Sequence, residues 1–131
     1  MIISKFFYFT ISGDDFDIDE FIGVVPLYGK IYRKDETITQ IYNNHIESIP
    51  QKTNRWVYSD SVHDCANPSG FLTKNLEVLY KNLRILKKYI NTHKAKIEYN
   101  IYAENRTDIK LSKKQISLLC KIGVPFYISF C

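Results

Sequence analysis

The sequence predicts an α+β fold, a two-layer sandwich in which helices cover one face of a mostly antiparallel sheet. Hydrophobic residues make up 45% of the 131 residues and charged residues 24%, so we expect a single globular domain over residues 1–131. Aromatic residues reach 15% and favour a sheet-rich core. A unit of strand, helix, glycine and strand occurs twice, with its helix and second strand over residues 12–28 and 112–127. The expected order is β-α-β-β-α-β-α-β, and its first six elements follow the split βαβ arrangement.

The first unit begins with an apolar run over residues 2–12. This run is hydrophobic on both alternating faces, so we expect a central strand that is covered on both sides. Asp17 is the expected N-cap of a short helix, and Glu20 completes a capping box three residues later. Gly23 is expected to end this helix in the left-handed conformation, and Pro26 prevents its continuation.

The middle of the chain is less regular than its ends. The sequence predicts two strands and a loop there, over residues 27–34, 54–59 and 61–70 respectively. Between the two strands, residues 37–42 are compatible with an extra strand, whereas residues 43–44 and 48–50 have the composition of turns. The arrangement of residues 35–54 is therefore left open.

The longest predicted element is one helix over residues 71–92. Leucine or isoleucine recurs from Leu72 to Ile90 at intervals of 4, 3, 4, 3 and 4, which places one apolar stripe along the helix. Polar and apolar residues then alternate over residues 94–104, as in a half-buried strand. The second unit follows: Ser112 with Gln115 forms a capping box, a glycine at position 123 ends the helix, and a strand closes the domain.

The formal net charge is +4, but one short segment carries five of the fourteen acidic residues. Capping and the helix macrodipole explain acids within the first helical turn, whereas those before the cap are less easily explained. The alternative interpretation is a docking surface for a basic partner, because complementary charge speeds association. The candidate partner-binding residues are the five acids of this segment and two lesser candidates, namely Asp14, Asp15, Asp17, Asp19, Glu20, Asp60 and Asp64.

Several classes of function are not favoured by the sequence. Three cysteines without framework spacing indicate reduced thiols and a cytoplasmic location, and no apolar run is long enough to span a membrane. No paired Cys or His motif indicates a metal site, and the five glycines are too scattered to form a phosphate-binding loop. We therefore expect no cofactor and no enzymatic activity. Basic residues on the long helix are not accompanied by a nucleic-acid-binding module, so direct nucleic-acid binding is not expected.

Five segments of the chain resemble the family DUF4279, small bacterial domains of unknown function: residues 9–17, 22–26, 32–35, 55–59 and 111–124. The chain departs from the family pattern around residues 37–52, which form a longer segment than the pattern needs. The resemblance supplies no catalytic residues. Small solitary domains of this kind resemble immunity proteins, which are encoded beside bacterial toxins, including those of contact-dependent inhibition systems.

The resemblance implies a cytoplasmic immunity protein that binds the domain of a cognate toxin, such as a nuclease, and blocks its active site. The acidic segment would then imitate phosphate groups, although the positive net charge argues against such a role. The alternative is a small-molecule or carbohydrate-binding module that uses an open face of the sheet, with tyrosines, Trp56 and Arg55 as contacts. An enzyme is the third and least favoured class.

Overall fold

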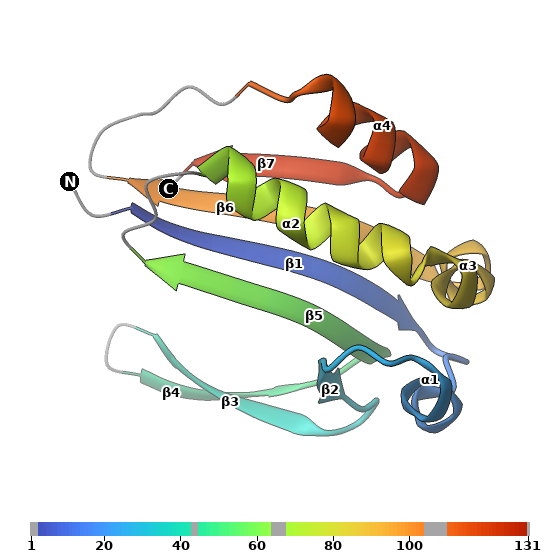
Figure 1. Ribbon diagram of the computed structural model, residues 1–131. Helices are drawn as coiled ribbons and strands as arrows, with labels where there is room; N and C mark the ends of the chain where they lie inside the picture. Colours follow the sequence, from blue (N-terminus) through green and yellow to red (C-terminus); the bar gives the residue numbers. More distant parts are fainter. Residues whose placement is uncertain (1–2, 43–44, 64–67, 104–109, 131) are drawn as a thin grey trace.

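The computed structural model describes residues 3–42, 45–63, 68–103 and 110–130. Five strands form one sheet in the order β2-β5-β1-β6-β7, and helices pack against it (Figure 1). The strands of this sheet are β1 (Ile3–Gly13), β2 (Lys30–Tyr32), β5 (Asn54–His63), β6 (Lys94–Ala103) and β7 (Phe126–Phe130). The helices are α1 (Ile18–Val24), α2 (Pro68–Lys81), α3 (Leu83–Thr92) and α4 (Lys113–Ile122). A second sheet consists of β3 (Thr37–Tyr42) and β4 (His45–Pro50).

The first strand of the chain lies at the centre of the large sheet. β1 pairs antiparallel with β5 on one side and with β6 on the other, and β2 pairs antiparallel with β5. β7 pairs parallel with β6. Helix α1 connects β1 to β2 across the intervening β5, and α2 with α3 connects β5 to β6 across the intervening β1. This is the split βαβ arrangement, extended by α4 and β7, and it confirms the predicted fold class.

The hydrophobic core lies between the sheet and the helices. Phe7, Phe9 and Ile11 of β1 are fully buried on the side that the helices cover. Each of the four helices contributes side chains to the same cluster, among them Ile18, Phe21, Leu72, Leu76, Leu86, Leu118 and Ile122. The alternating side chains of β1 point to the opposite face, which no helix in the described part of the chain covers (Figure 1). The expectation that β1 is covered on both sides is therefore wrong for this second face.

The two predicted helix starts are confirmed, but only one of the two glycine stops is. Asp17 accepts a hydrogen bond from the backbone of Glu20 at 3.1 Å, and both halves of the capping box at the start of α4 are present. The glycine after α4 has φ of 71°, as expected for a left-handed cap. Helix α1, in contrast, continues through Gly23 and ends with an extended residue, Val25. Pro26 explains this end, because a residue that precedes proline is biased toward the extended conformation.

The predicted helix over residues 71–92 is two helices. It starts earlier, at Pro68, and breaks at Asn82, whose φ and ψ are −100° and 8°. The Asn82 side chain donates a hydrogen bond to the carbonyl of Val78 at 2.8 Å, and such a bond competes with regular helix geometry. The leucine stripe continues across the break, but α3 runs in a different direction from α2 (Figure 1).

Strands β3 and β4 form an arm that continues the pairing of β2 with β5. The register is unshifted between the two sheets, from the Lys30–Val57 pair to the Thr37–Pro50 pair. Asp35, with φ of 70°, lies between the two paired regions. The extra strand over residues 37–42 is thus present.

Two boundaries in this region differ from the prediction. Residues 48–50 belong to a strand rather than a turn, because pairing with β3 overrides the local composition. Strand β5 extends to His63, where the sequence predicted a loop from residue 61. The turn expected at residues 105–108 lies outside the described residues.

Candidate functional site

The acidic segment at the start of α1 is largely occupied by contacts within the molecule. Asp17 caps the helix. Asp19 accepts two hydrogen bonds from the Arg33 guanidinium, at 2.8 and 3.3 Å. Glu20 accepts from Lys88 at 3.2 Å and from the Tyr89 hydroxyl at 3.3 Å. Asp19 and Glu20 therefore link α1 to the residue that follows β2 and to α3, and their charge is partly neutralised before any partner binds.

Of the remaining acidic candidates, Asp14 and Asp15 directly precede α1, whereas Asp60 lies far from it. Asp15 lies 3.5 Å from Nδ1 of His93, and Asp14 is exposed with no ion pair among the described residues. Asp60 lies on β5 opposite Phe7, six residues and about 20 Å along the strand from Asn54, which is paired with the end of β1. Asp64 lies outside the described residues.

The contacts at α1 shift three pKa values. Hydrogen bonding and charge from Arg33 lower the pKa of Asp19 below its usual value of 3.8. The Glu20 carboxylate raises the pKa of Lys88. Burial, followed by the charge of Glu20, raises the pKa of Tyr89. Each shift favours the protonation state that makes the observed contact at neutral pH.

The face of the sheet that no described helix covers is polar, aromatic and basic. The strand register places two rows of side chains across it, and each row runs through four strands. One row is Tyr32, Arg55, Ser12 and Lys94, and the next is Lys30, Val57, Thr10 and Lys96. Glu98 stands in a third row opposite Tyr8. The described part of this face thus carries four cationic side chains and one acidic side chain, an excess of three positive charges.

Arg55 differs from the other cations of this uncovered face in that part of its guanidinium is buried. Its guanidinium carbon lies 4.3 Å from the centre of the Tyr32 ring, which is a favourable stacking distance. Its Nε atom is buried and has no hydrogen-bond partner in the described structure, and none of the described carboxylates forms an ion pair with it. A buried guanidinium nitrogen normally has an acceptor. Trp56, the neighbouring residue, is fully buried on the opposite face. The expectation that it contacts a ligand on the open face of the sheet is therefore wrong.

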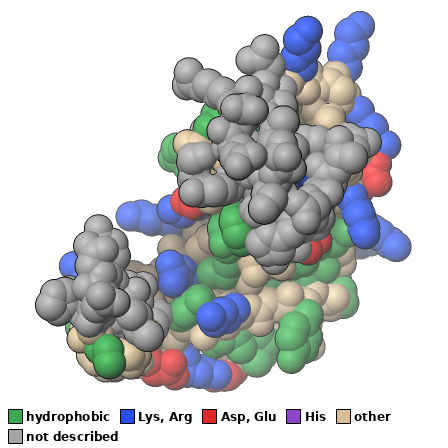
Figure 2. All heavy atoms as spheres, turned by 90° about the vertical axis from the view of Figure 1, so that its left-hand side faces the viewer, with side chains coloured by type: hydrophobic (Ala, Val, Ile, Leu, Met, Phe, Trp, Pro, Cys, Tyr) green, Lys and Arg blue, Asp and Glu red, His purple; other side chains and the backbone are tan. Residues whose placement is uncertain are grey.

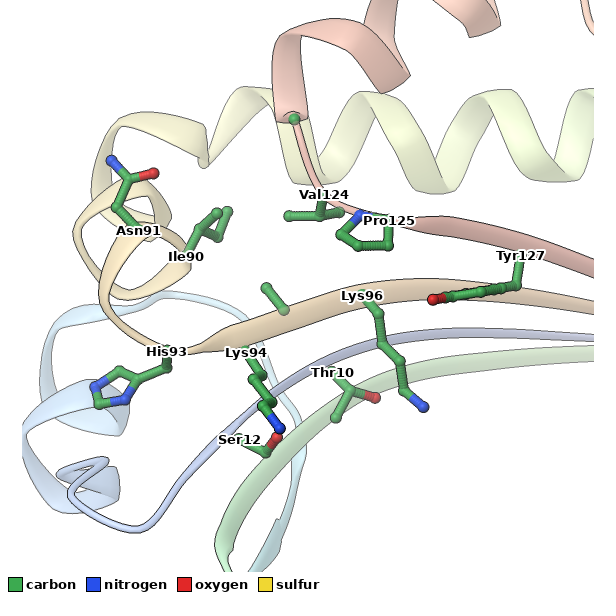
Figure 3. A pocket seen from close by; sticks show the side chains of 12 residues that line it. Thr10, Ser12, Ile90, Asn91, His93, Lys94, Lys96, Val124, Pro125 and Tyr127 are labelled. Carbon is green, nitrogen blue, oxygen red and sulfur yellow. The ribbon is translucent and has the colours of Figure 1, made fainter.

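Two recesses lie side by side on the uncovered face. The smaller, of about 220 Å³, is lined by Arg55, Tyr32, Tyr8, Val57, Glu98, Thr10 and Lys96. The larger, of about 620 Å³, shares Thr10 and Lys96 with it. It extends around the start of β6 to the end of α3 and the connection between α4 and β7, and it reaches Tyr127. Figure 3 shows that Lys94 and Lys96 project from β6 to the same side as Thr10 and Ser12, while His93 points away toward the loop after β1. The larger recess lies within the size range of small-molecule sites.

Figure 2 looks at the molecule along the sheet, from the end at which β1 begins and β5 and β6 finish, and the basic side chains visible there outnumber the acidic ones. Hydrophobic side chains lie between the basic ones. Glu98 on β6 is the one acidic side chain in the described part of the uncovered face. Its charge is neutralised by Lys96, which lies 2.6 Å away. The combination of positive charge with exposed rings suits an anionic ligand that also carries an apolar or planar part.

A second surface lies around the end of α1 and the segment that follows it. Ile22, Val24 and Tyr28 are 43%, 52% and 98% exposed, although each is apolar or aromatic. They adjoin a recess of about 440 Å³ whose lining includes Gly29 and Trp56. Grouped exposed apolar side chains of this kind are typical of protein–protein contacts.

Neither a metal cluster nor a membrane helix is found in the described residues. No group of three His, Cys, Asp or Glu side chains in them is placed to hold a metal ion. Among these residues no helix is long and apolar enough to cross a bilayer. Cys120 is exposed and not in a disulfide.

Comparison with known proteins identifies the family but not the activity. Neither the curated proteins nor the solved structures contain a match to the chain. Residues 4–130, almost the whole chain, match a single family that is described as a domain of unknown function. The chain therefore belongs to the DUF4279 family.

Proposed function

We propose that this protein binds an anionic ligand on the uncovered face of its sheet and acts by binding rather than by catalysis. The observation that carries the proposal is Arg55, whose Nε is buried without an acceptor in the described structure. Desolvating part of a guanidinium without pairing it costs free energy, and a bound anion would recover that cost. The surrounding excess of positive charge would attract such an anion from solution.

This proposal selects a different surface from the acidic segment near α1. Asp19 and Glu20 there are paired with Arg33 and Lys88, so a basic partner would have to displace these two contacts. The cations of the uncovered face are less engaged: among the described contacts, only Lys96 has a carboxylate partner. Binding to unpaired charges is more favourable than binding to paired ones, because no existing ion pair has to be broken.

Thermal unfolding in the presence of different anions tests the proposal. The panel consists of inorganic phosphate, citrate, a nucleotide, a short oligonucleotide and an acidic peptide, with neutral sugars for comparison. At ten times its dissociation constant, a ligand stabilises the folded protein by about 1.4 kcal/mol and raises Tm by about 4–7 °C. The proposal requires that at least one anion does this and that Arg55→Met removes the effect. If no anion raises Tm, or if only neutral sugars do, it is wrong.

A second candidate function is that of a cytoplasmic immunity protein that neutralises a bacterial toxin, such as a nuclease. The observation that favours it is the exposed apolar group formed by Ile22, Val24 and Tyr28, because aromatic and aliphatic side chains dominate the energetics of protein interfaces. Asp14, which has no ion pair in the described part of the chain, adjoins the start of the same helix and would contribute to association with a basic toxin.

Co-expression with the product of the neighbouring reading frame tests this second function. Rescue of growth and co-purification would support it. Tyr28→Ala should then weaken the complex by more than tenfold if Tyr28 is a central contact, whereas Asp14→Lys should mainly slow association and make it less sensitive to salt. Rescue that neither substitution affects would remove this surface from the proposal.

A further inference from the structure

We propose that the smaller recess holds the phosphate group of a phosphorylated small molecule, with the organic part in the larger recess beside it. This inference rests on the proposed function and assigns the chemical class of the ligand. It depends on the shape of the recess floor, on the arrangement of three cations and on the position of Glu98.

The floor between the two recesses is formed by short side chains. Ser12 of β1 lies between two long cationic side chains, Arg55 opposite it on β5 and Lys94 opposite it on β6. Thr10 lies between Val57 on β5 and Lys96 on β6. Backbones two strands apart are about 10 Å apart, so the ends of the Arg55 and Lys94 side chains can meet above the floor. Two hydroxyl groups below and cations on both sides form a trough for an anion.

The charge of this trough fits phosphate better than carboxylate. A carboxylate is a planar anion with a single charge, which one guanidinium can satisfy through two parallel hydrogen bonds. Here Lys96 and Thr10 line the smaller recess together with Arg55, and Lys94 and Ser12 line the adjoining part of the larger recess. A tetrahedral group with two charges accepts hydrogen bonds from all of these directions. The smaller recess, at about 220 Å³, is large enough for a phosphate and too small for most complete ligands.

Glu98 is the one feature of the recess that opposes an anion, and it gives the inference a specific test. It lines the smaller recess and lies 2.6 Å from Lys96. A bound phosphate would compete for Lys96 and would be repelled by the carboxylate. Removing the charge of Glu98 should therefore strengthen binding, an effect that a purely structural role of this residue would not produce.

The larger recess supplies the surface for the organic part of the ligand. Tyr127 pairs with Glu98, so it lies on the uncovered face, and it is 56% exposed at the border of this recess. Ala95 and Val124 line the part of the recess on the helix side of β6, where they also pack against the core. A planar ring or a sugar could stack on Tyr127 while its phosphate reaches across Lys96 to Arg55. We therefore expect a phosphomonoester with a ring to bind more tightly than inorganic phosphate.

Calorimetric titration at low salt with three probes tests the assignment. The probes are inorganic phosphate, adenosine 5′-monophosphate and adenosine, which separate the contribution of the phosphate from that of the ring. Backbone amide shifts of Thr10, Ser12 and Arg55 in heteronuclear spectra locate the site. We expect the monophosphate to bind, phosphate to bind more weakly, and adenosine not to bind measurably.

Two substitutions with matched controls identify the residues responsible. Arg55→Met keeps an unbranched apolar stem but removes the guanidinium, and it should weaken binding of the monophosphate at least about tenfold. Arg84→Met on α3 should not change this binding. Glu98→Gln should strengthen binding at least about twofold. Its control is Glu77→Gln, because Glu77 also pairs with a lysine, Lys114, but lies among the helices. Thermal unfolding of each variant confirms that it is folded.

The outcomes separate this inference from the function on which it rests. If only citrate or the acidic peptide binds, and Arg55→Met abolishes that binding, the phosphate assignment is wrong while the proposed function stands. If no anion binds, both are wrong. Binding of the monophosphate that Arg55→Met leaves unchanged, or that Glu98→Gln weakens, would also overturn the assignment.

Discussion

The close approach of Gly29 to Trp56 allows one substitution to be predicted in detail. A Cβ atom on Gly29 would lie 2.1 Å from Nε1 of Trp56 and 2.3 Å from its Cε2 atom. Ordinary van der Waals contact starts at 3.4 Å, so Gly29→Ala requires one of the two residues to move by about 1.3 Å. The indole cannot move easily, because it is fully buried and its ring centre lies 4.7 Å from that of Phe21 and 6.2 Å from that of Phe9.

The expected cost of Gly29→Ala is about 2–3 kcal/mol of unfolding free energy, typical of overpacking in a core. Urea denaturation followed by tryptophan fluorescence measures it, and the midpoint should fall while the slope stays unchanged. Gly23→Ala is the matched control, because no atom lies within 4 Å of the added Cβ and the residue is helical. That control should gain about 0.5–1 kcal/mol. If Gly29→Ala lowers the unfolding free energy by less than about 0.5 kcal/mol, the segment after α1 can move away from Trp56 at little cost and the packing argument is wrong.

Three further substitutions test contacts elsewhere in the fold. Gln115→Ala should cost about 2 kcal/mol in urea denaturation, because the buried amide closes the capping box of α4 and donates hydrogen bonds to α2; a cost near zero would contradict this. Gly123→Ala should cost about 1 kcal/mol, and Gly123→Asn less, since φ is 71°. Asp19→Asn should destabilise the protein at pH 7 but not at pH 2. The pKa of Asp19 is lowered on folding, so its stabilisation is present above pH 3.8 and is lost as the pH falls through the folded value; equal losses at both pH values would exclude the Arg33 contact as the cause.

Local sequence signals predicted the parts of the fold in which one pattern dominates. Both N-caps follow from capping residues, the central strand β1 from a continuous apolar run, and β6 from a period of two. The break at Asn82 could not be predicted from the leucine periodicity, which continues through it. Strand β4 contains a serine and a proline with turn propensity, and only its pairing with β3 makes it a strand.

The candidate site shows the same division between local and long-range information. The acidic segment is conspicuous in the sequence, but its partners Arg33, Lys88 and His93 lie 14 to 78 residues away, so their contacts were not visible. Arg55 was recognised as a contact of an open sheet face, whereas Lys94 and Lys96 were not. The polar side of the alternating run at residues 94–104 was the available signal, because a central sheet strand with a polar face implies that this face is uncovered.

The central position of β1 has a consequence for synthesis of the chain. This strand is made before either of its neighbours, which end at residues 63 and 103. At about 5–20 residues per second, roughly 5 to 18 s pass between completion of β1 and completion of β6. During that time the aromatic segment of residues 6–9 has no second edge to pair with, and such a segment is prone to aggregate. Ribosome-associated chaperones are therefore expected to matter more for the yield of this domain than for its final stability.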